Sequence, residues 1–184
     1  MKPNNLNTLI EGCRHNDRFA QRQLYEAFFQ YVNVIAERYA ENEVEAEEWT
    51  QDIFVKVFSK ISKYDAAFPF PSWLKKVAIN ACIDRYRLKI KATSATLNIE
   101  NADNLESAAA ALVDIDMDFL LHLVRQLPPS YRLSFNLFAL EGLQYQEIAD
   151  ETGISIGSVK SNISKARQML KEMILDNQKK ERYV

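Results

Sequence analysis

The stretch Tyr145-Gln-Glu-Ile-Ala-Asp-Glu-Thr-Gly-Ile-Ser-Ile-Gly-Ser-Val159 decides how the C-terminal part of this 184-residue chain folds. It predicts a short helix, a turn at Gly153 and a second helix that Ser155 caps, which is the helix-turn-helix pattern. Gly153 suits the turn because glycine adopts a positive φ without steric cost. Ala149 is small where the two helices would cross, and Ile148, Ile154, Val159 and Ile163 would fill the core between them. The alternative is a plain helical hairpin with a solvated basic face.

The second helix of this motif carries two kinds of side chain. Its apolar positions recur at helical spacing and are expected to face inward: Ile156, Val159, Ile163, Ala166, Leu170 and Met173. The remaining positions are polar or basic and are expected to face outward into a DNA groove: Ser158, Lys160, Ser161, Asn162, Lys165 and Arg167.

The rest of the chain is also predicted to be helical. It has only 4 glycines and 5 prolines, which disfavours sandwiches, barrels and glycine-rich nucleotide folds. Apolar residues recur at helical spacing from Tyr25 to Tyr39. Asn42 and Glu45 resemble a capping box at the start of a helix over Glu43–Lys60, and Ser72 can cap another from Trp73 to about Lys91. We expect an all-α protein.

Two helical domains follow from where this pattern weakens. The segment from Thr93 to Val113 has little periodicity, and helical pattern resumes at Phe119, breaks at Pro128-Pro129 and stops at Gly142. We therefore expect a first domain of three helices over residues 1–92, a flexible acidic linker over 93–115 and a second domain over 116–184.

Charge is sorted along the chain although the net charge is only −2. Residues 41–54 hold six acids and no base, whereas residues 55–92 hold nine bases and two acids. Residues 93–118 again hold six acids and no base, and residues 155–184 hold seven bases and three acids. Two basic blocks, each behind an acidic one, predict two contacts with a polyanion.

The helix from Trp73 combines an aromatic side chain with positive charge on one stripe. Such a surface suits single-stranded nucleic acid, because bases stack on aromatic rings while basic groups follow the phosphates. The alternative is a solvated basic helix whose tryptophan seals the edge of the core.

The order of these features resembles the extracytoplasmic-function sigma factors of bacterial RNA polymerase. The segment Ala46-Glu-Glu-Trp-Thr-Gln-Asp-Ile-Phe-Val-Lys-Val-Phe58 is similar to the polymerase-binding segment of that family. The segment Phe70-Pro-Ser-Trp-Leu-Lys-Lys-Val-Ala-Ile-Asn80-Ala-Cys-Ile-Asp-Arg-Tyr-Arg87 is similar to its minus-ten segment. Leu127-Pro-Pro-Ser-Tyr-Arg132, Tyr145-Gln-Glu-Ile-Ala149 and Gly157-Ser-Val-Lys-Ser-Asn-Ile-Ser-Lys-Ala-Arg167 match the minus-thirty-five domain in order and spacing.

The resemblance implies a transcription initiation factor that recruits core RNA polymerase to promoters and helps to melt them. Three residues would bind core polymerase: Glu48, Gln51 and Asp52. The loop around Phe68 and Phe70 would hold a base flipped out of the minus-ten duplex, with Trp73, Lys76, Asn80 and Arg87 beside the displaced strand. The outer face of residues 158–167 would read the minus-thirty-five duplex in the major groove.

Partners and departures also follow from the resemblance. Core RNA polymerase, promoter DNA and an anti-sigma factor are the expected partners, with no cofactor, metal or small-molecule substrate. Asn162 stands where many members carry arginine, and Ile79 where arginine is common, so the promoter sequence does not transfer. Asparagine pairs with adenine whereas arginine prefers guanine, so the change at Asn162 either shifts the preferred base or removes a phosphate contact.

Two other functional classes, a hydrolase and a dimeric DNA-binding regulator, explain the sequence less well. A hydrolase built on the acids of residues 41–52 is disfavoured, because no histidine lies near them and no P-loop or nucleophile elbow exists. We therefore expect no enzymatic activity. A dimeric helix-turn-helix regulator that acts without core polymerase would leave the first domain unexplained.

The cellular location is also predicted. No uncharged apolar run approaches the roughly 18 residues of a membrane span. We expect a cytoplasmic protein without a membrane-inserted segment, in which Cys13 and Cys82 are free thiols.

Overall fold

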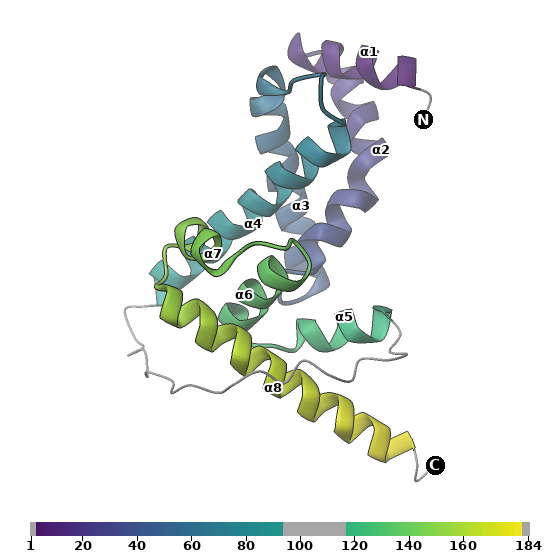
Figure 1. Ribbon diagram of the computed structural model, residues 1–184. Coiled ribbons are helices and arrows are strands. Elements are labelled where there is room, and N and C mark those ends of the chain that lie inside the picture. The colour runs from purple at the N-terminus through teal and green to yellow at the C-terminus, as the bar shows by residue number, and fades with distance from the viewer. Residues whose placement is uncertain (1–2, 94–116, 182–184) are drawn as a thin grey trace. The chain divides into compact units, whose positions relative to one another are not determined.

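The computed structural model describes residues 3–93 and 117–181, and every regular element in these two ranges is a helix (Figure 1). The prediction of an all-α fold is confirmed. Contacts divide the chain into two compact units, residues 1–85 and 86–184, which we describe separately. The predicted linker lies outside the described residues apart from Thr93, the last residue of α4.

The N-terminal unit contains one helix more than the sequence predicted. Its elements are α1 (Pro3–Arg14), α2 (Arg18–Glu37), α3 (Glu43–Lys60), a short 3-10 turn η1 (Ile61–Lys63) and most of α4 (Phe70–Thr93). The unpredicted helix is α1, whose sequence is largely polar but which buries Leu9, Ile10 and Cys13. It approaches α2 so closely that a Cβ at Gly12 would lie 2.6 Å from the Cβ of Ala20.

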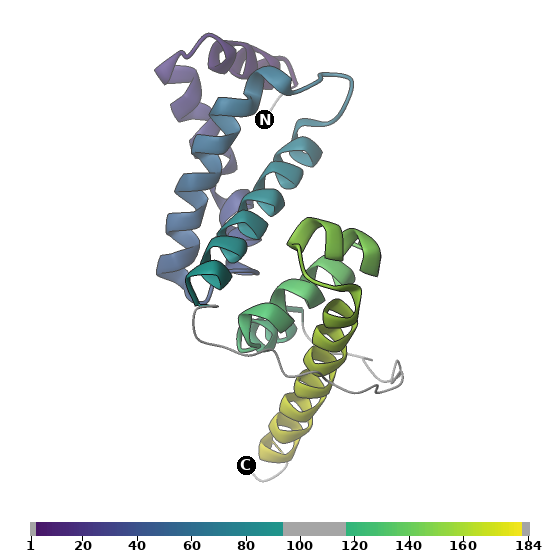
Figure 2. The same ribbon diagram turned by 90° about the vertical axis from the view of Figure 1, so that its left-hand side faces the viewer.

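The core of this unit lies between α2, α3 and α4, which run side by side (Figures 1 and 2). The predicted apolar stripe of α4 is buried throughout: Leu74, Val77, Ala78, Ala81 and Cys82. On α2, Val32, Ile35 and Ala36 are buried as expected, whereas Tyr25 and Phe29 are half-buried. These two rings instead form an aromatic cluster with Phe54, whose centroid lies 4.7 Å from that of Tyr25.

Local capping chemistry sets most helix starts. The Asn42 side chain accepts a hydrogen bond from the Glu45 N–H at 2.9 Å, so the predicted start of α3 is confirmed. The predicted start of α4 at Trp73 is wrong, because the helix begins three residues earlier at Phe70. Pro71 then falls in the first turn, where a proline ring has no hydrogen bond to remove.

The C-terminal unit contains the predicted helix-turn-helix. Its helices are α5 (Met117–Arg125), α6 (Pro129–Ala139), α7 (Tyr145–Thr152) and α8 (Ile156–Glu181). Gly153 has a φ of 76° and its N–H bonds to the Ala149 carbonyl at 2.8 Å, which ends α7. The Ser155 hydroxyl accepts from the Ser158 N–H at 3.0 Å and caps α8. One buried cluster joins α8 to α5 and contains Leu123, Val124, Leu127, Ala166 and Leu170. Leu137 of α6, Ile148 of α7, and Val159 and Ile163 of α8 are also buried.

Two side chains of the motif depart from the prediction. Ile156, expected to face inward, is 38% exposed at the first position of α8. Ile154, expected in the core between the helices, is half-buried in the turn. Both lie at the turn between α7 and α8, where fewer neighbours surround a side chain than in the middle of α8.

Both cysteines are free and buried, as the sequence predicted. Burial, reinforced by the nearby Asp17 carboxylate, raises the pKa of the Cys13 thiol to about 11. Burial also raises the pKa of the Cys82 thiol. Among residues 3–93 and 117–181, no helix is both long and apolar enough to cross a membrane.

Candidate polymerase and nucleic-acid interfaces

The outer side of α3 carries the predicted polymerase-binding residues. Glu48 and Gln51 are exposed. Val44 and Val55, at helical spacing from them on the same side, are 70% and 68% exposed. We call these four residues the α3 patch: Val44, Glu48, Gln51 and Val55. It pairs a carboxylate and an amide with apolar ends, a composition that suits a protein partner better than DNA.

The third predicted polymerase-binding residue, Asp52, forms an ion pair within the protein. Its carboxylate forms an ion pair with the Arg85 guanidinium of α4, and the Lys56 ammonium pairs with the Asp84 carboxylate at 2.7 Å. Both pairs join α3 to α4. Each is partly exposed and contributes at most about 1 kcal/mol to stability. Asp52 therefore links α3 to α4, a contact that the sequence prediction did not include.

The loop between η1 and α4 presents one aromatic ring and buries another. Phe68 is 65% exposed, whereas Phe70 is 2% exposed. The Phe70 ring lies among three others, with centroids 5.2 Å from those of Phe28 and Tyr64 and 5.6 Å from that of Trp73. The expected stacking surface at Phe70 is therefore absent, because this ring fills the core at the start of α4. Phe68 alone of the two predicted rings is available to a base.

The basic stripe of α4 begins beside this loop. Lys76 is exposed, whereas Trp73, Asn80 and Arg87 are half-buried. The Trp73 ring packs against Tyr64 at 5.5 Å and against Phe70. Trp73 thus lies beside the rings of Tyr64 and Phe70, as expected if it seals the edge of the core. The residue is half-buried, so part of it remains exposed.

Two of the predicted DNA-binding groups on α8 lie over aromatic rings. The Lys160 ammonium is 5.7 Å from the Tyr145 centroid, and the Arg167 guanidinium is 5.2 Å from the Phe138 centroid. Phe138 and Tyr145 stack on each other at 5.1 Å with an interplanar angle of 15°. Residues 160 and 167 are seven positions apart and so share one side of α8. This pair of stacked rings could not be predicted from the sequence, because Phe138 lies on α6 and Tyr145 on α7.

The other predicted residues of α8 do not share that side. Asn162 is half-buried, and its amide nitrogen donates to the buried Ser134 hydroxyl of α6 at 3.2 Å. The Lys165 ammonium lies 5.8 Å from the Tyr131 centroid, and the Ser158 hydroxyl bonds to that of Ser155. The six residues therefore do not share one outward face, because a helix turns about 100° per residue. One of the two amide hydrogens of Asn162 is used by Ser134, so pairing with adenine would have to use the other.

Comparison with known proteins finds two matches to one protein family, one in each half of the chain. The family model "Sigma-70 region 2" matches residues 24–89, and "Sigma-70, region 4" matches residues 120–170. ECF RNA polymerase sigma factor SigM of Bacillus subtilis is 32% identical over 130 residues, which are 70% of this chain and 78% of that protein. The chain belongs to the extracytoplasmic-function (ECF) sigma factors. It is a transcription initiation factor, and its family is not one of catalytic enzymes.

Other known proteins are also similar to this ECF sigma factor. SigE of Mycolicibacterium smegmatis is 30% identical over 145 residues, which are 76% of this chain and 56% of that protein. A structure of the sigma factor RpoE with the anti-sigma factor NepR from Bartonella quintana is 21% identical, with a TM-score of 0.48 over 83% of this chain and 95% of that one. Both halves of the chain match sigma-factor regions. A dimeric regulator that acts without binding polymerase is therefore not favoured. Helix α1 lies outside both family matches.

The aromatic platform under α8 yields a prediction. Tyr145→Ala should weaken binding of the ECF sigma holoenzyme to a promoter duplex about twofold to tenfold, because a cation–π contact and a ring stack are worth about 0.5–1.5 kcal/mol. The charge of Lys160 remains, so the slope of log affinity against log salt should stay the same. Lys160→Ala should instead reduce that slope by about one. A slope that also falls by about one in Tyr145→Ala would contradict this prediction, because it would show that the Lys160 contact with phosphate is lost without the ring.

Proposed function

We propose that the three surfaces divide the work of initiation. The α3 patch binds the coiled-coil clamp helices of the largest polymerase subunit, the loop with Phe68 and the α4 stripe take the displaced minus-ten strand, and α8 reads the minus-thirty-five duplex. The observation that carries this proposal is the exposure of Phe68 on a hydrogen-bonded loop directly before a basic helix.

Electrostatics support this division. Three of the four residues of the α3 patch lie in the acidic segment of residues 41–54, which repels DNA phosphates but suits a protein partner. Helix α4 follows with basic side chains, of which Lys76 is exposed. Along the chain, an acidic helix is followed by a loop with an exposed aromatic ring and then by a basic helix. This order suits a factor that binds polymerase while it contacts an unpaired DNA strand.

Melting in this proposal needs no enzymatic chemistry. Flipping a base out of the duplex costs a few kcal/mol, and stacking on an aromatic ring returns about 1–3 kcal/mol. The Phe68 ring offers such a face. Trp73, Lys76, Asn80 and Arg87 then line the path of the unpaired strand.

We also propose an anti-sigma factor as a partner, by analogy with members of the family, and the cytoplasm as the place of action, because core polymerase and the chromosome are found there. The proteins in the structure from Bartonella quintana form such a complex. In this protein the exposed Val44 and Val55 offer apolar anchors for a partner that competes with polymerase.

Reconstitution tests the proposal. The full chain is mixed with core polymerase, and run-off transcription is measured on a library of random promoters, followed by permanganate footprinting on the selected templates. We expect selected two-element promoters and reactive thymines in the minus-ten region that depend on the chain. DNA binding by a dimer of this chain without core polymerase, together with no transcription, would overturn the proposal in favour of the dimeric regulator.

A further inference from the structure

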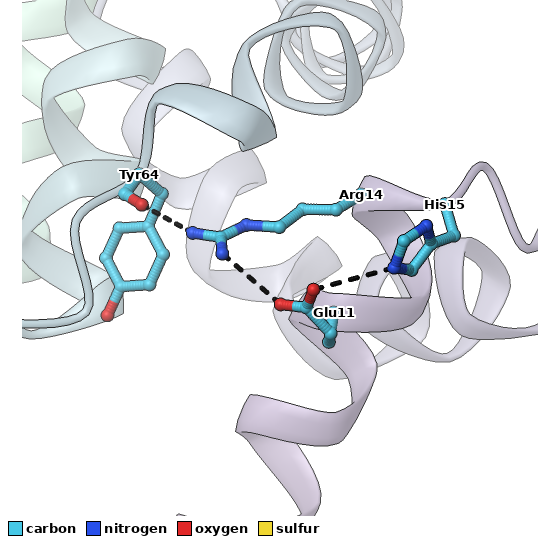
Figure 3. A network of polar contacts seen from close by, with 4 residues as sticks. All are labelled: Glu11, Arg14, His15 and Tyr64. Atoms are coloured by element: carbon cyan, nitrogen blue, oxygen red, sulfur yellow. Dashed lines mark hydrogen bonds and ion pairs between the residues drawn. The ribbon is translucent and has the colours of Figure 1, made fainter.

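The last residue of α1 holds the loop that presents Phe68. Arg14 is half-buried, and its guanidinium donates a 2.6 Å hydrogen bond to the backbone carbonyl of Tyr64, fifty residues away in sequence (Figure 3). The other terminal nitrogen of the guanidinium lies 3.2 Å from a carboxylate oxygen of Glu11, one turn earlier on α1. The Glu11 pair orients the guanidinium toward the loop.

Tyr64 in turn controls both ends of the loop over residues 64–69. Its side chain is 7% exposed, and its ring packs edge to face on Phe70. Its hydroxyl donates a 2.6 Å hydrogen bond to the carbonyl of Phe68. The Asp65 carboxylate accepts from the Ala67 N–H at 2.9 Å within the same loop. The backbone on either side of the exposed Phe68 ring is therefore fixed by bonds that begin at Arg14 and Tyr64.

These contacts are separable from those that fold α1 and the core. Helix α1 is docked through Leu9, Ile10 and Cys13 and through the close approach of Gly12 to α2. The Tyr64 ring is held by Phe70 and Trp73. The Arg14 guanidinium adds to these only a bond to a loop carbonyl. Its loss should thus leave the fold in place and free the loop.

We propose that Arg14 is a positioning residue for promoter opening: through Tyr64 it keeps the Phe68 loop in one conformation before a base arrives. This inference rests on the proposed base-binding role of Phe68. A loop that is already ordered loses less conformational entropy on binding, so it captures an unpaired base more tightly. Helix α1 then contributes to melting without touching DNA.

The test uses the full chain in complex with core polymerase. Arg14→Met keeps an unbranched side chain of similar packing and removes every donor, whereas Arg14→Lys can still donate one bond. Tyr64→Phe removes only the hydroxyl that bonds to Phe68. The matched control is Arg22→Met, the same substitution at an exposed arginine of α2 that pairs with the Glu26 carboxylate. Phe68→Ala reports on the proposed function itself.

Three quantities are measured for each variant: affinity for core polymerase, affinity of the holoenzyme for a single-stranded oligonucleotide with the minus-ten sequence, and opening of the duplex promoter. We expect Arg14→Met and Tyr64→Phe each to weaken oligonucleotide binding and opening about fivefold to thirtyfold. The combined variant should be less impaired than the product of the two defects, because both act on one loop. Core affinity and the melting temperature should match those of Arg22→Met, and Arg14→Lys should recover part of the loss.

The outcomes separate the two ideas. If Phe68→Ala impairs capture and opening but Arg14→Met binds the oligonucleotide as the wild type does, the positioning role is wrong and the proposed function stands. If Phe68→Ala has no effect, the proposed function of the loop fails and the inference fails with it. If Arg14→Met loses core affinity or folded fraction to the same extent as it loses oligonucleotide binding and promoter opening, Arg14 is a structural residue. That result would overturn the proposal.

Discussion

Replacing Glu48 and Gln51 with lysine should abolish binding of this sigma factor to core polymerase, a loss of at least about a hundredfold in affinity. Both side chains are exposed on the α3 patch, and within residues 3–93 and 117–181 neither forms an ion pair with another side chain. The double change raises the net charge of the proposed interface by three units. Unfavourable charge pairs in an interface cost several kcal/mol. Affinity is measured by fluorescence anisotropy of the labelled chain titrated with core polymerase.

The structure refines the choice of residues for this experiment. Asp52 is left unchanged, because lysine there would face the Arg85 guanidinium and push α3 and α4 apart. Glu26→Lys with Gln30→Lys is the matched control, since it makes the same charge change at exposed positions of α2. The control should retain binding within about threefold. Wild-type affinity of the α3 variant would remove the α3 patch from the polymerase interface.

The second large effect separates two neighbouring aromatic residues. Phe68→Ala should reduce promoter opening about tenfold or more while changing the free energy of unfolding by less than about 0.5 kcal/mol, because the ring is exposed. Phe70→Ala should destabilise the N-terminal unit by about 3–5 kcal/mol, because its buried ring packs against Phe28, Tyr64 and Trp73.

Opening is followed by permanganate reactivity on a duplex promoter, and stability by urea unfolding of the free protein. Phe70→Leu is the control for packing, since it keeps most of the apolar volume and should recover most of the stability. A large opening defect in Phe70→Leu at normal stability would return Phe70 to the base-binding surface. An unfolding midpoint of Phe68→Ala well below that of the wild type would instead make Phe68 a packing residue.

The sequence alone determined the features that depend on near neighbours in the chain. The cap at Asn42, the positive φ of Gly153 and the cap at Ser155 each involve groups within four residues, and all three are present. The buried stripe of α4 follows from helical periodicity in the same way. The all-α class and the helix-turn-helix therefore followed from local chemistry, as did the family resemblance, because its motifs are short and ordered.

Only the tertiary structure decided which candidate side chains are available to a partner. Phe68 and Phe70 are two residues apart and alike in sequence terms, but Phe70 meets Phe28, which lies 42 positions earlier, and is buried. Asn162 turns toward Ser134, Asp52 pairs with Arg85, and Lys160 and Arg167 lie over rings from other helices.

The bond from Arg14 to Tyr64 is the same kind of contact, and it joins a helix that the sequence did not predict to the loop of the proposed site. Side-chain exposure and pairing depend on which helices pack together and on the angle at which they cross. Periodicity gives the buried face of one helix but does not encode what lies opposite it.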